Sequence, residues 1–187
     1  MSSIPARPFV SIEDYLSGEV ESEVKHEYLA GHVYAMVGAT NAHNLIASNV
    51  LGLLHAQLAG RGCRVFNSDT KVRLRREHGT YFYYPDVMVA CTLNPLEETF
   101  QDSPVVIIEV LSDSTGRTDE GEKREAYLSI QTLEAYVLME QALKSAVVYT
   151  RGDSGFLRQE YGAGERFELP IENLSLELDR AYEGLAI

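Results

Sequence analysis

Hydrophobic and polar positions in the first part of the chain recur at two spacings, one typical of helices and one of strands. The stretch at 40–60, "TNAHNLIASNVLGLLHAQLAG", repeats apolar side chains at helical spacing and predicts the clearest helix. The stretch at 11–16, "SIEDYL", opens with a serine three residues before an aspartate, a capping-box-like start for a short helix. Between them, alternation within 26–38 predicts a hairpin that turns at Ala30 and Gly31.

The remaining apolar segments are short and mostly predict strands. The central ones are expected at 63–74, 81–90 and 105–111. A second helix is expected around 119–130, followed by strands at 135–140, 146–151, 156–161 and 166–170. This order predicts a mixed α/β fold with one layer of sheet, flanked by helices and extended by antiparallel hairpins. The length of 187 residues is that of one domain, roughly 100–200 residues, so we expect residues 1–187 to form a single domain.

The net charge restricts the kinds of partner that the chain is expected to bind. Sixteen basic against 28 acidic residues give a formal net charge of -12, which argues against coating nucleic acid through bulk electrostatics. A local basic groove remains compatible with this total. Six of the basic residues lie within one 16-residue segment that contains a single acid, Asp69: Arg61, Arg64, Lys71, Arg73, Arg75 and Arg76.

Cysteine content and hydropathy indicate a compartment. Cys63 and Cys91 are too few and too far apart in sequence for a disulfide scaffold or a complete structural zinc site, which fits a reducing cytosol. No uncharged apolar run approaches the ~20 residues that span a bilayer, and the N-terminus does not resemble a signal peptide. We therefore expect a soluble, unprocessed, cytoplasmic protein that does not bind a membrane.

Two carboxylates interrupt the apolar strands. In "TYFYYPDVMVA", Pro85 and Asp86 break a strand, and a proline there indicates an edge, a bulge or a bend. The pair also suits an ordinary turn. In "VVIIEVLSDST", strand periodicity places Glu109 on one face near the end of the strand, where sites often form in α/β sheets. An ion pair with an arginine would equally account for it.

Taken together, Asp86 and Glu109 indicate a specific chemistry. Two carboxylates on neighbouring strands repel each other unless a cation lies between them, and their oxygens suit Mg²⁺ or Mn²⁺. Such an ion can contact a phosphate oxygen and lower the pKa of bound water, as phosphodiester hydrolysis requires. The spacing of "PD" and the later acid resembles the PD-(D/E)XK nuclease superfamily.

Further segments narrow this resemblance to one family. The segments "HEYLAGHVYAM", "NAHN", "YYPDVMVAC", "VVIIEVLSDST", "DEGEKREAY" and "LEAYVLME", spanning about residues 20–150, resemble the Uma-two family of restriction-endonuclease-like proteins. The resemblance implies a restriction-endonuclease-like core with Asp86 and Glu109 as metal ligands. It also matches Glu27, which could supply a third oxygen, and His43, which could bind phosphate or assist proton transfer. Glu27 could equally be a surface acid, and His43 a helix cap or a core polar group.

The chain departs from the superfamily motif at one position. The motif places a lysine two residues after the second acid, where this chain has Leu111, and leucine cannot orient or activate water. The resemblance suggests Lys123 as the replacement, on the same helical face as Tyr127. Lys123 could also be an ordinary solvated charge of the helix. Lys71 is the other candidate for this role.

Several polar residues near these motifs favour structural roles. Asp69 could face the same cleft, whereas Asp119 is expected to cap a helix. The serines and the threonine at 112–115 resemble turn and cap residues, since the chain has no G-x-S-x-G elbow.

The sequence therefore predicts a metal-dependent endonuclease acting on nucleic acid, with DNA favoured, and a homodimer by superfamily resemblance. Leu111 supports a non-catalytic interaction protein that retains a degenerate nuclease core. A phosphodiesterase acting on small nucleotides is a third possibility.

Overall fold

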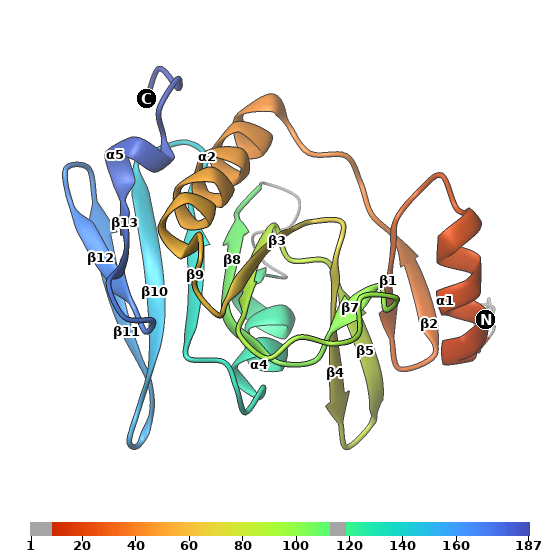
Figure 1. Cartoon of the computed structure of the whole chain (residues 1–187). Coiled ribbons are helices and arrows are strands. Elements are labelled where there is room, and N and C mark those ends of the chain that lie inside the picture. Colours follow the sequence, from red (N-terminus) through yellow and green to blue (C-terminus); the bar gives the residue numbers. More distant parts are fainter. Residues whose placement is uncertain (1–8, 113–118) are drawn as a thin grey trace, which may run out of the picture.

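The computed structural model describes residues 9–112 and 119–187, and its strands form two main sheets and a small one (Figure 1). The five-stranded sheet has the order β2 (His32–Ala35), β1 (His26–Leu29), β5 (Gly79–Tyr83), β4 (Lys71–Arg76) and β7 (Phe100–Gln101). The six-stranded sheet has the order β11 (Gly155–Gly162), β10 (Ser145–Gly152), β9 (Ala135–Met139), β8 (Pro104–Val110), β6 (Val87–Ala90) and β3 (Arg64–Asn67). The small sheet pairs β12 (Arg166–Leu169) with β13 (Leu174–Glu177).

The mixed α/β class is confirmed, but the expected single layer of sheet is wrong. The predicted strand at 81–90 divides into β5 and β6, which belong to different sheets, because Pro85 and Asp86 bend the chain between them. The predicted strand at 63–74 divides in the same way into β3 and β4, at a turn in which the Thr70 amide donates to the Asn67 carbonyl. Both chain segments therefore pass from one sheet into the other.

Helices cover the faces of these sheets. The helix α2 (Asn41–Leu58) packs its buried side chains, among them Ile46 and Val50, against one face of the six-stranded sheet. The opposite face packs against α4 (Arg124–Leu128) through a second apolar cluster that includes Tyr127. The helix α1 (Ile12–Glu21) lies beside β1 and β2 and contributes to a third cluster (Figure 1).

Both predicted helix starts and the predicted hairpin turn are present. The Ser11 hydroxyl accepts from the Asp14 amide at the start of α1, and the Thr40 hydroxyl accepts from the His43 amide at the start of α2. Two residues, Ala30 and Gly31, connect β1 to β2 with positive φ angles of 48° and 100°, which is why the turn contains a glycine. The Thr40 cap fixes the first turn of α2 and with it the position of His43.

Four further elements differ from the sequence prediction. The expected helix at 119–130 is shorter, and consists of a π-helical turn η1 (Asp119–Lys123) followed by α4. The β7 and β13 strands and the short helix α5 (Leu178–Ala181) were not predicted. The side chain of Asp119 and the serine and threonine expected at 114–115 lie outside the described residues.

The two cysteines are joined in a disulfide between Cys63 and Cys91, which the sequence analysis did not expect. The antiparallel pairing of β3 with β6 matches Arg64 with Ala90, so that the residues just before and just after this pair lie opposite each other. A separation of 28 positions in sequence therefore becomes contact across neighbouring strands. None of the helices in the described residues is long and apolar enough to cross a membrane.

Candidate active site

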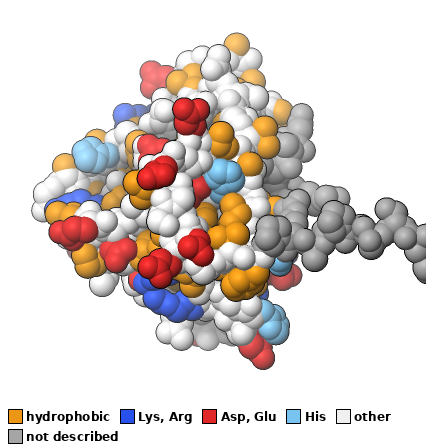
Figure 2. Space-filling view, turned by 90° about the vertical axis from the view of Figure 1, so that its right-hand side faces the viewer, with side chains coloured by type: hydrophobic (Ala, Val, Ile, Leu, Met, Phe, Trp, Pro, Cys, Tyr) orange, Lys and Arg blue, Asp and Glu red, His pale blue; other side chains and the backbone are white. Residues whose placement is uncertain are grey.

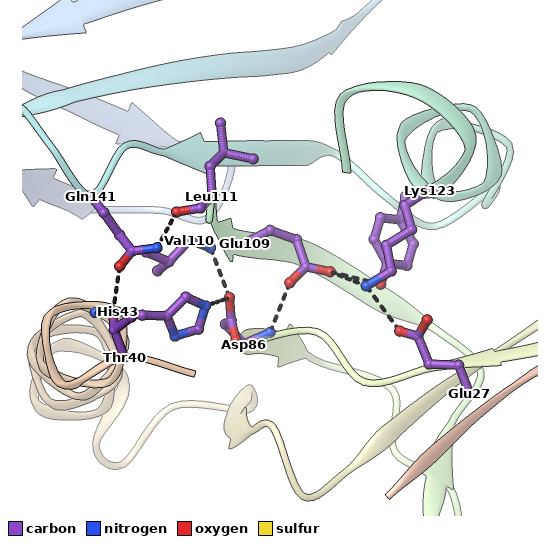
Figure 3. Close-up of polar contacts among 10 residues, drawn as sticks. Glu27, Thr40, His43, Asp86, Glu109, Val110, Leu111, Lys123 and Gln141 are labelled. Atoms are coloured by element: carbon purple, nitrogen blue, oxygen red, sulfur yellow. Dashed lines mark hydrogen bonds and ion pairs between the residues drawn. The ribbon is translucent and has the colours of Figure 1, made fainter. Parts of the chain in front are cut away.

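The two acids singled out in the sequence lie together where β6 begins and β8 ends (Figure 3). These strands are antiparallel neighbours, with Val87 opposite Ile108. The Asp86 amide donates to Oε2 of Glu109 over 3.2 Å, and Oδ2 of Asp86 accepts from the Val110 amide over 2.8 Å. The bend after β5 therefore places each acid against the backbone of the other strand.

His43 approaches Asp86 from the first turn of α2. Its Nε2 lies 3.1 Å from Oδ2 of Asp86, and the residue is only 9% exposed. Burial lowers the pKa of His43, but the hydrogen bond and negative charge of Asp86 outweigh it and leave the pKa raised. The imidazole therefore belongs to the same polar cluster as the two acids.

Glu109 is 3% exposed, and partners from the helical segment after β8 meet its carboxylate. The Tyr127 hydroxyl donates to Oε1 of Glu109 over 2.9 Å, and Nζ of Lys123 lies 3.9 Å from the same oxygen. Burial, followed by the charges of Glu109 and Glu27, raises the pKa of Tyr127 well above its usual value, so its hydroxyl stays a donor. A carboxylate in an apolar strand is thus compensated by one helical face.

Lys123 joins the acids to the five-stranded sheet. Its Nζ lies 2.9 Å from Oε1 of Glu27, which points inward from β1, and the Lys123 side chain is 8% exposed (Figure 3). The interpretation of Lys123 as a solvated surface charge is therefore wrong, and so is that of Glu27 as a surface acid, since its side chain is 15% exposed. The structure brings Glu27, Lys123 and Glu109 into one connected cluster.

Leu111 lies at the motif position of the missing lysine and has a different role. Its side chain is 7% exposed and packs in the apolar cluster that contains Tyr127. Its carbonyl accepts from Nε2 of Gln141 over 2.6 Å, and Oε1 of Gln141 accepts from the Thr40 hydroxyl over 2.6 Å. Gln141 and Thr40 thus tie the end of β8 to the start of α2, a bridge across 101 positions that no local pattern reveals.

The other basic and acidic candidates lie elsewhere. Lys71 contacts the ring of Tyr84 rather than Glu109, and Asp69 pairs with Lys25 on the turn before β4. The six clustered basic residues do not form one patch, because they are distributed over the α2–β3 connection, β3 and β4, and β3 and β4 belong to different sheets. Arg73 is also neutralised by two hydrogen bonds to Asp102.

Buried atoms that lack hydrogen bonds gather at this cluster. Within the described residues, four buried side-chain atoms accept or donate none, and three of them belong here: Glu27 Oε1, His43 Nδ1 and Tyr83 Oη. The Glu27 oxygen has its ion pair with Lys123 but not hydrogen-bond geometry, and Lys123 lies 5.7 Å from the Tyr83 ring centroid. Such atoms are costly unless a ligand meets them.

The donor chemistry fits a hard divalent cation. Asp86, Glu109 and Glu27 offer carboxylate oxygens, the ligands that Mg²⁺ and Mn²⁺ prefer. In the described part of the chain no three acidic, histidine or cysteine side chains already converge as a complete metal cage. Asp86, Glu109 and Glu27 are the residues that would hold such a cation, which would supply positive charge next to Lys123 and His43.

The mixed sheets flanked by helices and the acids at adjoining strand ends define a restriction-endonuclease-like protein. A family model described as "Uma2: Putative restriction endonuclease" matches residues 12–181, so the chain belongs to the Uma2 family. The family expected from the sequence is thus confirmed.

Individual relatives agree with this assignment. The uncharacterized proteins slr1290 and sll1609 of Synechocystis are 34% and 28% identical, over 97% and 94% of this chain and 97% and 100% of theirs. A crystal structure described as a putative nuclease belonging to DUF820, from Anabaena variabilis, is similar with a TM-score of 0.69. At 17% identity, covering 89% of this chain and 96% of that one, it supports the fold alone.

Proposed function

We propose that this protein is a metal-dependent endonuclease that hydrolyses phosphodiester bonds, with DNA as its substrate. The observation that carries the proposal is the linked set of Asp86, Glu109 and Lys123, in which two acids from adjoining strands meet an amine from the following helix. In a family whose model is described as "Putative restriction endonuclease", this set combines oxygen ligands for a cation with a group that can act on water.

Each residue has a distinct proposed role. Asp86 and Glu109 hold Mg²⁺ or Mn²⁺, with Glu27 as a third oxygen. The bound cation would supply positive charge for the phosphate and lower the pKa of water. Lys123 orients the attacking water from the helical side, taking the role of the lysine that Leu111 replaces. His43, held by Asp86, contacts the phosphate or transfers a proton.

The test is cleavage of supercoiled plasmid, with single-stranded DNA and structured RNA assayed in parallel. Nicking of DNA in Mg²⁺ or Mn²⁺, abolished by EDTA and by Glu109→Gln, is expected. Glu97→Gln changes an exposed loop acid and serves as the matched control with unchanged activity. Cleavage of RNA without cleavage of DNA would reject DNA as the substrate. Cleavage that persists in Glu109→Gln would reject the proposed active site.

A non-catalytic nucleic-acid-binding protein is the rival function, and Leu111 is the observation that favours it. Its buried side chain leaves the usual lysine position without a polar group. Binding of DNA without metal-dependent cleavage by purified wild-type protein, at enzyme and metal concentrations where a known nuclease is active, would establish the rival. Hydrolysis of a model diester without cleavage of polymers would instead indicate a small-nucleotide phosphodiesterase.

We also propose a homodimer, by analogy with the superfamily. A pocket of about 360 Å³ lies beside the edge strand β3, lined by Leu51, Gly52, His55, Val65, Phe66 and Asn67, and includes none of the catalytic candidates. This open edge offers a surface for a second copy. Light scattering after size-exclusion chromatography should give twice the 20.8 kDa chain mass, and a monomer would reject this assembly.

A further inference from the structure

In the part of the chain that the structure describes, a second buried lysine, Lys71 on β4 of the five-stranded sheet, has no anionic partner in contact with its ammonium group. Lys71 is 4% exposed, and among the described residues its side chain forms no ion pair or hydrogen bond. Its Nζ instead lies 5.1 Å from the centroid of the Tyr84 ring. Burial lowers the pKa of Lys71, Glu19 opposes this effect and Lys25 adds to it. Burial of an ammonium group is costly without an anion, so this arrangement calls for a ligand.

The aromatic ring that contacts Lys71 also contacts a lysine at the surface. Nζ of Lys25 lies 5.7 Å from the Tyr84 centroid, and its side chain is 40% exposed. It donates to the Ser68 carbonyl over 2.8 Å and pairs with Asp69 over 2.5 Å. Because the Asp69 side chain is 68% exposed, an oxyanion already contacts this lysine from the solvent side.

Both lysines lie close to the candidate active site, but neither is one of its proposed catalytic residues. Lys25 precedes Glu27 by two residues and Tyr84 precedes Asp86 by two, distances of at most about 7 Å along an extended chain. The Tyr84 hydroxyl donates to Oε2 of Glu19 over 2.7 Å, which directs Tyr84 toward α1. Lys71 is thus next to the site but not aimed at Glu109.

We propose that Lys71 and Lys25, which both contact the Tyr84 ring, form a phosphate-binding site, and that it holds a backbone phosphate near the one that is cleaved. The second part of this inference rests on the proposed nuclease function. A phosphate would supply the anion that Lys71 lacks and would displace the exposed Asp69 carboxylate from Lys25. On the α1 face, acidic side chains prevail over basic ones (Figure 2), so an anion is attracted only where ammonium groups offset them.

Binding without cleavage tests this site directly. Fluorescence anisotropy of a labelled oligonucleotide in EDTA, over a series of salt concentrations, gives both the affinity and its salt dependence. We expect Lys71→Met to weaken binding about tenfold and to reduce the slope of log K against log salt by about 0.7–0.9, the value of one phosphate contact. Lys144→Met, which removes a lysine paired with Asp179, should change neither quantity.

Two further measurements keep the test decisive. Lys25→Met alters a partly exposed residue and should reduce the salt slope even if Lys71→Met unfolds. Competition by millimolar inorganic phosphate that is absent from Lys71→Met would support the site and identify free phosphate as a ligand. If oligonucleotide binding depends on these lysines but free phosphate does not compete, the result would support a site for phosphates of a polymer.

Wild-type affinity and salt slope in both folded lysine variants, without competition by phosphate, would overturn the proposal. This outcome is separate from a failure of the nuclease proposal, because binding in EDTA needs no cleavage. A protein that binds through Lys71 and cuts nothing would keep the phosphate site and lose the nuclease. A protein that cuts DNA and binds independently of both lysines would do the reverse.

Discussion

Leu111 shows, at the scale of a single residue, how the site differs from the superfamily motif. Its side chain fills an apolar cluster with Tyr127, so the position cannot host an amine without a large cost. We expect Leu111→Lys to lower the free energy of unfolding by more than about 2 kcal/mol and not to raise activity, because a buried charge is left unpaired. Urea denaturation measures the change.

Leu111→Met is the matched control, since it nearly conserves volume and should cost less than about 1.5 kcal/mol. Equal stability of the lysine and methionine variants would show that residue 111 can reach solvent or an anion.

Tyr127 is the residue that satisfies the buried carboxylate of Glu109. Removal of its hydroxyl leaves an oxygen of a 3% exposed acid without that donor. Tyr127→Phe should therefore lower the free energy of unfolding by about 1–3 kcal/mol, as measured by urea denaturation. Tyr161→Phe, at a partly buried position on β11, should stay within about 0.5 kcal/mol of wild type. An unchanged stability in Tyr127→Phe would mean that Glu109 is satisfied by other groups.

At the scale of elements, the side chain of Asp102 links the short strand β7 to Arg73 of β4. Asp102 follows β7 and accepts two hydrogen bonds from Arg73, over 2.7 and 2.6 Å, and one from Asn94. Burial acts to raise the pKa of Asp102, but these donors outweigh it and leave the pKa below 3.8. This depressed pKa means that the stabilisation is present above pH 3.8 and is lost as the pH falls through the folded-state value.

Asp102→Asn should accordingly be less stable than wild type by about 1–2 kcal/mol near neutral pH. The difference should shrink as the pH falls below about 4, where Asp102 of the unfolded chain becomes protonated, and should be lost at still lower pH, where Asp102 of the folded protein becomes protonated. Urea denaturation at a series of pH values measures it. A difference that persists unchanged in acid would assign the effect to packing rather than charge.

Elements with strong local signals were predictable from the sequence, whereas the division of strands between sheets was not. The period of α2, its Thr40 cap and the Ala30–Gly31 turn are encoded in neighbouring residues. The separation of β5 from β6 depends on which distant strands each one pairs with, and Pro85 indicates only that a bend exists.

The same limit applies to the candidate site. The positions of Asp86 and Glu109 at strand ends were readable from alternation and from the family resemblance. The contact of Lys123 with Glu27 spans nearly a hundred positions, so only the resemblance suggested that both matter. Tyr127 was indicated by helical spacing from Lys123, but its hydrogen bond to Glu109 was not.

For the whole molecule, a net charge of -12 means that cations can stabilise the fold in two ways, by binding at the site or by diffuse screening. The size of the stabilisation distinguishes site-specific binding when variants are compared. A cation that binds only the folded chain stabilises it by about 2.7 kcal/mol at a hundred times its Kd. For a chain of this size we expect Mg²⁺ or Mn²⁺ to raise Tm by about 5–10 °C at that concentration. The double variant Asp86→Asn, Glu109→Gln should lose this shift, and Glu97→Gln should keep it. An equal shift in all three proteins would indicate diffuse screening instead.

The disulfide between Cys63 and Cys91 makes the central part of the molecule a covalently closed loop that holds Asp86 and Lys71 but leaves Glu109 outside. With a sequence separation of 28 between the two cysteines, this closure should contribute about 3.5 kcal/mol, so a reductant should lower the free energy of unfolding by that amount. A protease site inserted between Glu77 and His78, in the exposed turn of this loop, offers a second measurement. After cleavage, the oxidised protein should migrate as one band on a denaturing gel, and it should separate into two fragments only when the disulfide is reduced. Asp86 thus lies in a covalently closed loop, whereas Glu109 lies on a strand outside that loop.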